Sequence, residues 1–477
     1  MTSELTWLST RELAHLIGTG ELSAVDAADD HLERIAEVNP TINAVVTLDA
    51  EAALARAVEA DRAYAAGERL PLLHGVPMTH KDTHSTEGMR TTFGSPVFAD
   101  NVPDADSLVI ARLRAAGVNT TGKTNVPEFA AGSHTFNPLF GTTVNPYDPS
   151  RSAAGSSGGV GAVIAAGIQA SGDGSDMGGS LRIPGSFNNV VGLRPTNGRL
   201  PHVPPQDPWS WLSQSGFMAR TVGDVALLMQ AACGPDPRGP GSIDEPGTVF
   251  DLPEFRLGAR YEPDLDGLRV GFAPDFAGRV RVESAVLDIV RAAGPVFEEL
   301  GAQMSEACIR LDDADEVFDT QRAYDFALNW GELVRSRRAD IKEAVVWNTE
   351  RGLALTADEI ISKDRARARL REDVAEYFTE HDILVTTMAQ VLPFDAGIEY
   401  PTEIEGVPFE TYLDWMRSAT QISATGCPAI SVPAGFTASG LPVGIQIVAA
   451  PGRDVDLLRV AHAFEAATGH HLRHPEI

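Results

Sequence analysis

The strongest constraint on the fold is the way short apolar runs alternate with helical stretches along the chain. Residues 107–116 have a helical pattern, residues 118–122 the pattern of a strand, and the apolar residues 160–166 are predicted to form a buried helix. Later strands and helices are predicted at residues 268–272, 282–300, 382–386, 442–448 and 454–468. Alternation of this kind is typical of an α/β layered fold built around a mixed sheet.

The 477 residues are predicted to form one domain, because no internal repeat or low-complexity tract divides them. Helices are expected at the N-terminus, over about residues 1–70, and a variable helical insertion is expected over about residues 310–420. The stretch from about residue 199 to 266 is rich in Pro, Gly and Trp and has little periodicity, so it gives no helix or strand signal.

Charge and cysteine content narrow the classes of partner and the compartment. The net charge is −28, which argues against nucleic acids and membrane surfaces as general partners. No apolar run reaches the roughly 18 residues that a membrane span needs, and the start of the chain has no signal-peptide pattern. Cys233, Cys308 and Cys427 are far apart and odd in number, so they are interpreted as buried thiols in a reducing compartment. The expected location is the cytoplasm.

Two glycine- and serine-rich segments and one lysine suggest the chemistry. The segments are Gly-Ser-Ser-Gly-Gly at residues 155–159 and Gly-Ser-Asp-Met-Gly-Gly-Ser at residues 174–180, and Lys81 lies upstream. Glycine lets the main chain approach a substrate and direct several N–H groups at one point, which makes these serines candidate nucleophiles. A lysine can act as their base if its charge is suppressed. Together they predict a serine hydrolase that does not use histidine.

Other hydrolase and cofactor patterns fit less well. Residues 155–159 formally match the G-x-S-x-G nucleophile elbow, which needs a strand directly before it, whereas residues 145–151 are interpreted as a loop. The 12 histidines show no H-E-x-x-H pattern, so no metal is expected. Phosphate-loop and dinucleotide patterns are incomplete, so no cofactor is expected either.

Ser180 is the better candidate nucleophile, because Met177, Gly178 and Gly179 offer consecutive backbone N–H groups around its hydroxyl, as an oxyanion hole requires. Lys81 must be neutral to act as the base, although the ordinary lysine pKa is about 10.4. Burial is the main way to lower that pKa. In an extended segment Lys81 and Asp82 would point to opposite faces, so Asp82 would not hold the lysine charged.

From about residue 73 to the C-terminus the chain resembles the amidase signature enzymes, and the likeness is densest over residues 141–201. It rests on Asn-Pro-Tyr-Asp-Pro at 145–149, Ala-Gly-Ser-Ser-Gly-Gly at 154–159, Gly-Ser-Asp-Met-Gly-Gly-Ser-Leu-Arg-Ile-Pro at 174–184, Gly-Leu-Arg-Pro-Thr at 192–196, Gly-Cys-Pro-Ala-Ile-Ser-Val-Pro at 426–433 and Gly-Leu-Pro-Val-Gly-Ile-Gln at 440–446. The resemblance implies a central, mixed and twisted sheet with helices on both faces.

The resemblance also implies a Ser–cis-Ser–Lys triad. Ser180 would be the acyl nucleophile, Ser156 the proton relay with a cis peptide bond, and Lys81 the base. The N–H groups of Met177, Gly178 and Gly179 would form the oxyanion hole. Supporting roles would fall to Ser157, Asp176 and Arg182. Three residues depart from the family pattern without removing a catalytic atom: Ala154, Met177 and Phe217.

The substrate is less constrained than the bond. The candidate pocket residues are Ala131, Phe136, Leu139, Trp209 and Trp211. The Pro-Trp-Ser-Trp sequence at 208–211 is interpreted as a lid over an apolar ligand. We therefore expect small-molecule substrates that are bulky apolar or aryl amides, or carbamates (urethanes), since the chain is similar to family members that cleave these. A homodimer is compatible with this interpretation.

Two other functions stay open at this point. The first is the glutamine-hydrolysing A chain of a tRNA-dependent amidotransferase, which would need a cationic pocket for a free amino acid and a large partner interface. The second is a catalytically inactive binding protein, which the presence of all three catalytic positions disfavours.

Overall fold

The computed structural model describes residues 5–203, 207 and 209–477. Within them the largest sheet has eight strands and is mixed. The two pairs that β11 makes with β12 and β13 are parallel, and the other pairs are antiparallel. In spatial order the strands are β12 (Gln303–Ser305), β11 (Arg269–Phe272), β13 (Ile383–Thr387), β17 (Pro442–Ala449), β16 (Ala429–Phe436), β9 (Val191–Arg194), β10 (Gln214–Ala219) and β8 (Ser171–Asp176).

A smaller sheet has the order β1 (Val45–Leu48), β3 (Asn119–Thr124), β2 (Pro77–Lys81). Strand β2 pairs with β3 in parallel and lies beside β8, the last strand of the large sheet. Side chains link the two sheets: Gln169, just before β8, accepts a hydrogen bond from the main-chain N–H of Thr79 at 2.9 Å. This junction brings Lys81, the last residue of β2, into contact with Ser175 on β8.

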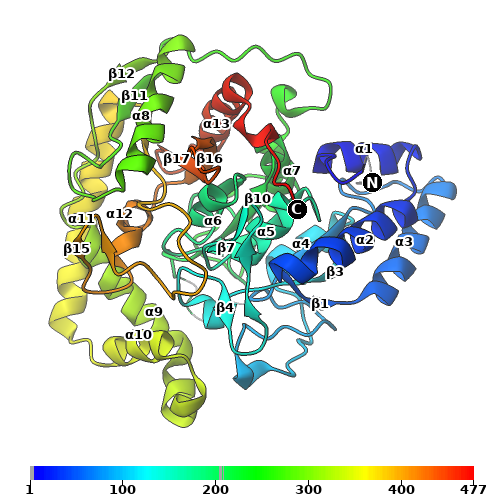
Figure 1. The fold of residues 1–477 in the computed structure, drawn as a ribbon, viewed down its shortest axis with the longest axis horizontal. Helices are drawn as coiled ribbons and strands as arrows, with labels where there is room; N and C mark the ends of the chain where they lie inside the picture. Colours follow the sequence, from blue (N-terminus) through cyan, green and yellow to red (C-terminus); the bar gives the residue numbers. More distant parts are fainter. Residues whose placement is uncertain (1–4, 204–206, 208) are drawn as a thin grey trace.

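Helices cover both faces of the large sheet, which confirms the predicted α/β fold (Figure 1). One face is packed by α5 (Gly158–Ala165) and α6 (Arg182–Phe187). The opposite face is packed by α7 (Val222–Ala232), α8 (Ser284–Glu299) and α13 (Asp454–Thr468). The strands predicted near residues 118–122, 268–272, 382–386 and 442–448 correspond to β3, β11, β13 and β17.

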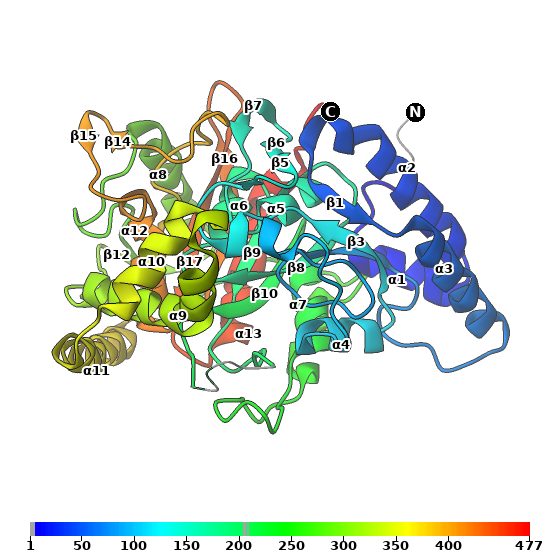
Figure 2. The ribbon, with the colours of Figure 1, turned by 90° about the horizontal axis from the view of Figure 1, so that it is seen from below.

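The remaining helices lie at two ends of the molecule, as both ribbon views show (Figures 1 and 2). The N-terminal helices α1 (Thr10–Thr19), α2 (Ala24–Ile42) and α3 (Ala50–Ala65) lie at one end, near α4 (Leu108–Ala115). The other end is formed by the segment expected to be a helical insertion, with α9 (Ala314–Arg337), α10 (Glu343–Leu353), α11 (Ala357–Glu380) and α12 (Arg417–Thr425). Short hairpins are formed by β4 (Phe136–Asn137) with β5 (Gly141–Thr142) and by β14 (Glu403–Ile404) with β15 (Val407–Pro408).

The structure corrects two expectations. The stretch at 199–266 contains β10 and α7, although the sequence gives no signal for either. Strand β10 lies between β9 and β8 with every residue buried, and α7 is buried on most sides, so neither shows the polar–apolar alternation that identifies a strand or an amphipathic helix. The segment at 145–151 is also not a loop, because β6 (Val144–Asn145) and β7 (Asp148–Ser152) form a hairpin there.

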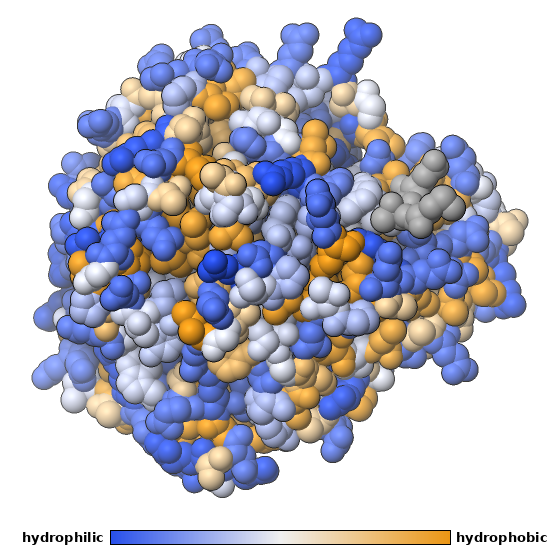
Figure 3. Space-filling model, in the orientation of Figure 1, coloured by the Kyte–Doolittle hydropathy of each residue, from blue (hydrophilic) through white to orange (hydrophobic). Residues whose placement is uncertain are grey.

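Figure 3 shows hydrophilic side chains over much of one face of the molecule, with smaller apolar patches between them. Across the described ranges, no helix combines the length and the apolar character needed to cross a membrane.

Candidate active site

The predicted nucleophile Ser180 lies in the turn between β8 and α6 and is half-buried. Gly179 has φ +107, a backbone conformation that favours glycine. The carbonyl oxygen of Ser180 accepts a hydrogen bond from the main-chain N–H of Ser157 at 3.1 Å. The two glycine- and serine-rich segments are therefore in direct contact, with Ser157 immediately before α5 and Ser180 just before α6.

Close approach of these segments depends on glycine at residue 174. A Cβ atom on Gly174 would lie 2.8 Å from the hydroxyl oxygen of Ser157. The peptide bond between Gly155 and Ser156 is cis, the conformation that the family resemblance implies.

Lys81 is fully buried and its ammonium nitrogen contacts three serine hydroxyls, a group we call the lysine cluster. The Nζ atom lies 2.8 Å from Oγ of Ser156, 2.9 Å from Oγ of Ser157 and 2.9 Å from Oγ of Ser175. A neutral amine has two N–H donors and one lone pair, so three hydroxyls satisfy it when one of them donates to the nitrogen. The lysine cluster therefore suits a lysine that gains and loses a proton.

Burial favours the neutral form of the Lys81 amine. It lowers the pKa of Lys81 from 10.5 to about 7, against the opposing attraction of Asp176 and Asp173. Asp82 does not contact the amine of Lys81. Its carboxylate accepts hydrogen bonds from the main-chain N–H and the hydroxyl of Thr92. The cation that favours the ionised form of Asp82 is Lys123. The predicted separation of Lys81 from Asp82 is thus confirmed.

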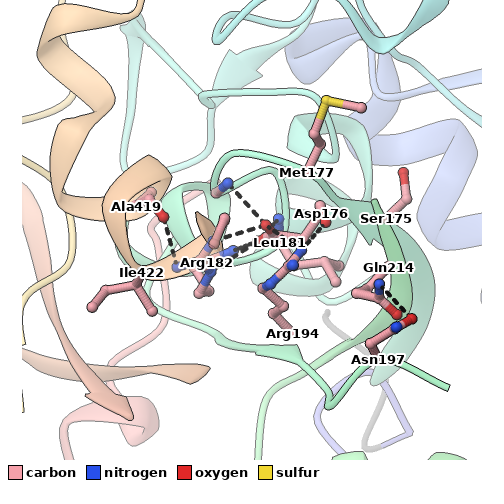
Figure 4. Close-up of polar contacts among 12 residues, drawn as sticks. Ser175, Asp176, Met177, Leu181, Arg182, Arg194, Asn197, Gln214, Ala419 and Ile422 are labelled. Carbon is pink, nitrogen blue, oxygen red and sulfur yellow. Dashed lines mark hydrogen bonds and ion pairs between the residues drawn. The ribbon is translucent and has the colours of Figure 1, made fainter. Parts of the chain in front are cut away.

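A second buried group, the arginine cluster, consists of Asp176, Arg182 and Arg194 (Figure 4). The guanidinium of Arg182 donates to both carboxylate oxygens of Asp176, at 2.8 and 3.0 Å, and Arg194 lies 3.6 Å from the same carboxylate. Although burial opposes ionisation, these two arginines hold the pKa of Asp176 well below its usual range. Arg182 also donates to Gln446 on β17 and to Ser423 on α12, so the cluster ties the nucleophile turn to the sheet and its covering helix.

The three predicted oxyanion donors differ in availability. The N–H of Gly179 donates to Asp176 at 2.9 Å, so it is already occupied. Among the described residues, the N–H groups of Met177, Gly178 and Ser180 have no hydrogen-bond partner.

The predicted pocket residues are dispersed. Ala131 is fully buried in an apolar cluster that the partly buried Met177 also contacts. Phe136 is half-buried beneath the ammonium of Lys342, and the main-chain N–H of Leu139 donates to Asn137 at 3.0 Å. Only Ala131 of these three shares a cluster with the nucleophile turn.

The two tryptophans of the expected lid separate. Trp211 is 5% exposed, belongs to the main core and packs against the guanidinium of Arg367 at 3.8 Å, whereas Trp209 is 70% exposed. Pro208 lies outside the described residues. Trp211 is thus a core residue rather than part of a lid.

Several site residues give no signal in the sequence. Ser175 is part of a recognised motif, but nothing distinguishes its hydroxyl from that of Ser157. Asp173 contacts the main chain of Lys81 across two sheets, and a partner 92 residues away leaves no local pattern. The apolar cluster beside Met177 includes aromatic rings from three separate segments, namely Phe93, Phe98, Phe129 and Trp330.

Comparison with known proteins agrees with this geometry. The chain is 36% identical over 470 residues to an acylamidase from Rhodococcus erythropolis, covering 97% of this chain and 96% of the relative. It is 34% identical over 496 residues to the A chain of the glutamyl-tRNA(Gln) amidotransferase from Thermosynechococcus vestitus, covering 98% and 99%.

Solved structures are similar over almost the whole chain. A bacterial aryl acylamidase of the amidase signature enzymes superposes with a TM-score of 0.91 at 25% identity, covering 98% of both chains. A 6-aminohexanoate cyclic dimer hydrolase in complex with its substrate superposes with a TM-score of 0.87 at 26% identity, covering 99% of both chains. The profile of the amidase family matches residues 26–458. The chain is therefore a hydrolase of amide C–N bonds and belongs to the amidase signature family.

Proposed function

We propose that this amidase hydrolyses bulky apolar and aryl amides, and carbamates, through an acyl-enzyme on Ser180. The observation that carries the proposal is the contact of the buried Lys81 amine with Ser156 at 2.8 Å, in a segment hydrogen-bonded to the main chain of Ser180. A lysine with a pKa of about 7 is partly neutral at neutral pH and can accept a proton.

In the first half of the reaction, the Nζ atom of Lys81 takes the proton of the Ser156 hydroxyl as Ser156 takes that of Ser180. The Oγ atom of Ser180 then forms a bond to the carbonyl carbon. We assign the resulting oxyanion to the free N–H groups of Met177 and Gly178. The proton returns through Ser156 to the leaving nitrogen, the C–N bond breaks and the amine departs. Water hydrolyses the remaining ester by the same proton route.

A partly buried aromatic cluster beside the nucleophile turn supports the substrate class. Phe129 and Trp330 lie with ring centroids 4.3 Å apart, and Phe93 packs against Trp330 at 6.4 Å. All three rings belong to or border the apolar cluster that Met177 contacts. Aromatic rings prefer edge-to-face and offset contacts with other rings, so we assign an aryl group of the substrate to the partly buried rings of this cluster, Phe93 and Trp330. Urethane cleavage follows if the carbonyl carries an alkoxy group in place of an alkyl group.

The proposal also covers the binding partner, the cellular compartment and the oligomeric state. A small-molecule amide or carbamate is the proposed partner. The three cysteines are free, which is consistent with a reducing compartment and with the proposed location in the cytoplasm. The homodimer remains a prediction.

One observation favours the second candidate, release of ammonia from glutamine. Arg322 on α9 is buried, and within the described residues it makes no ion pair within 4.0 Å. One of its guanidinium nitrogens donates to the sulfur of Met177 at 3.1 Å and another to the hydroxyl of Tyr412 at 2.6 Å. A thioether is a weak acceptor, so the carboxylate of a free amino acid could replace it.

The test is hydrolysis of three substrates, a 4-nitroanilide, an N-aryl carbamate and free glutamine, by the wild type and Ser180→Ala. We expect turnover of the anilide and the carbamate, and its loss in the variant. Ser336→Ala, at an exposed serine on α9, should retain wild-type rates. Turnover of glutamine alone would replace the proposal by the second candidate, and substantial activity in Ser180→Ala would remove the nucleophile assignment.

A further inference from the structure

A buried carboxylate lies behind the lysine cluster and takes no direct part in the proposed chemistry. Asp173 and Ser175 are two residues apart on β8 and therefore face the same side. Ser175 contacts the Nζ atom of Lys81 at 2.9 Å, and Asp173 accepts the main-chain N–H of Lys81 at 3.2 Å. Strand β8 thus contacts both the main chain and the side-chain amine of Lys81.

Two histidines complete the surroundings of Asp173. The Nδ1 atom of His80 lies 2.5 Å from one carboxylate oxygen, and the Nδ1 atom of His84 lies 2.6 Å from the other. Because an ionised carboxylate only accepts hydrogen bonds, both Nδ1 atoms carry a proton and donate to Asp173. The Nε2 atom of His80 lies 3.0 Å from the hydroxyl of Thr120, which also accepts from Arg114 at 3.3 Å. We call Asp173, His80 and His84 the Asp173 network.

The Asp173 network differs from the arginine cluster in how its charge is balanced. In the part of the chain that the structure describes, no arginine or lysine side chain lies within 4.0 Å of the Asp173 carboxylate. Asp176, by contrast, is balanced by Arg182 and Arg194. Although burial opposes ionisation, the two histidines hold the pKa of Asp173 well below its usual range, so the carboxylate is an anion at neutral pH. Asp176 and, after it, Asp173 both favour the ammonium form of Lys81. Of these two anions, Asp173 is the one that also binds the main chain of Lys81 and has no arginine or lysine within 4.0 Å among the described residues.

Other charged groups act near Lys81 from the neighbouring strand and loops. Lys123 on β3 is fully buried, donates to the carbonyl oxygen of His84 at 2.6 Å, and has a pKa lowered by burial to about 8. Asp82 and, after it, Asp173 favour the charged form of Lys123. Burial lowers the pKa of His84, against the opposing hydrogen bond and attraction of Asp173. Lys123 makes no ion pair with the Asp173 carboxylate within 4.0 Å, so among the described residues the two histidines are its nearest ionisable partners.

We propose that Asp173, held between His80 and His84, is a positioning residue that orients Lys81 and sets the pH above which this lysine works as the base. The proposal rests on the proposed role of Lys81. Asp173 counteracts the effect of burial, because a nearby anion favours the ammonium form. It thereby keeps the lysine basic enough to take a proton from Ser156, while the hydrogen bond to the Lys81 main chain keeps the amine in place.

The central test is the pH dependence of kcat/KM for the anilide in Asp173→Asn. Loss of the anion disfavours the ammonium, so Lys81 should deprotonate at lower pH. The acid limb should move down by about one pH unit, with a lower plateau. The control is Asp224→Asn, which removes another fully buried carboxylate that accepts main-chain N–H groups, from Thr10 and Arg11 at 3.1 Å. The control should leave the limb in place. An unshifted limb in Asp173→Asn would overturn the proposal.

Variants of His84 test the same proposal if Asp173→Asn does not fold. His84→Leu removes one N–H dipole from the carboxylate and leaves its charge less screened, so the acid limb should move to higher pH, opposite to Asp173→Asn. His84→Asn can keep an amide N–H near the Nδ1 position and should restore the wild-type limb. A downward shift in His84→Leu, or equal profiles in both variants, would contradict the proposal.

A readout without catalysis separates this proposal from the proposed function. The difference in unfolding free energy between Asp173→Asn and Asp173→Asn/Lys81→Met, followed against pH, reports the titration of Lys81 alone. We expect its midpoint below that of the corresponding wild-type pair. If Ser180→Ala remained active while this midpoint moved, the proposed function would fail and the coupling of Asp173 to Lys81 would stand. An unchanged midpoint would overturn the coupling even in an active enzyme.

Discussion

The lysine cluster and the arginine cluster lie at the same end of β8 and are equally buried, yet they hold charge in different ways. Lys81, Arg182 and Arg194 are each at most 1% exposed. Arginine keeps its proton at any pH that a protein survives, and Asp176 is bound by two of them. Lys81 instead contacts hydroxyls and two anions at longer range, and its pKa is about 7.

The difference shows that the end of β8 carries two kinds of buried charge, one that supports the structure and one that can titrate. The arginine cluster supplies a fixed support, because Arg182 also binds α12 and β17 and so anchors the turn that carries Ser180. The lysine cluster supplies a site where the cost of a buried charge is not fully offset. In a structural ion pair, a buried charge that its partners do not fully stabilise would weaken the fold. In a lysine that acts as a base, the same shortfall lowers the pKa toward neutrality.

The largest expected effect comes from giving the lysine cluster a fixed cation. Arginine cannot accept a proton, so if Lys81 is the base, as we propose, Lys81→Arg should lower kcat for the anilide by about 10³-fold. The matched control is Lys363→Arg on α11, which changes a lysine paired with Asp364 and should have little effect. Near-wild-type kcat in Lys81→Arg would show that the lysine is not the base.

The converse change removes the anion from the arginine cluster. Asp176→Asn leaves Arg182 and Arg194 buried without a carboxylate, so the free energy of unfolding should fall by about 3–5 kcal/mol. Denaturant unfolding at pH 7 measures it. Asp148→Asn, which breaks the exposed pair with Arg151 at 3.6 Å, should cost less than about 1 kcal/mol. Equal losses in both variants would mean that the buried arginines have enough other partners.

The sequence predicts the lysine cluster better than the arginine cluster and the Asp173 network. Ser156 and Ser157 lie in a glycine-rich motif, and their contacts with Lys81 follow from the resemblance to a family. The second arginine on Asp176, Arg194, comes from β9, and no local pattern links it to β8. Pairings of this kind depend on which strands become neighbours.

The fold shows the same limit. Helix α13 is predicted at its observed bounds because one of its faces is polar, whereas β10 and α7 are buried almost throughout and give no such pattern. For Trp211 the expected lid is wrong for a related reason, whereas a lid role for the exposed Trp209 stays a prediction. An aromatic residue in a Pro-rich stretch suggests a loop, but Trp211 enters the core because Arg367, far along the chain, covers its ring.

The smallest effect sharpens the comparison by measuring what the buried lysine costs. The pKa of Lys81 is about 7 in the folded protein and about 10.4 in an unfolded chain. Below pH 7 both states hold the proton, and folding bears the full cost of the buried ammonium. Between pH 7 and 10.4 the unfolded chain binds more protons than the folded one, so stability rises with pH and the cost disappears.

Lys81→Met removes that titration, so it should be more stable than the wild type at pH 6 and lose this advantage by pH 10. A shift of three to four pKa units corresponds to about 4–5 kcal/mol. The methionine forfeits hydrogen bonds to three serine hydroxyls, each worth about 1 kcal/mol, so a net gain of about 1–2 kcal/mol is expected at pH 6. Unfolding by guanidinium chloride at both pH values measures it. The comparable change in the arginine cluster is Arg182→Met. It should be destabilising at both pH values, because it leaves the buried carboxylate of Asp176 without its main cationic partner. If Lys81→Met were destabilising at pH 6, the lysine would be a compensated structural cation, and the contrast between the two clusters would disappear.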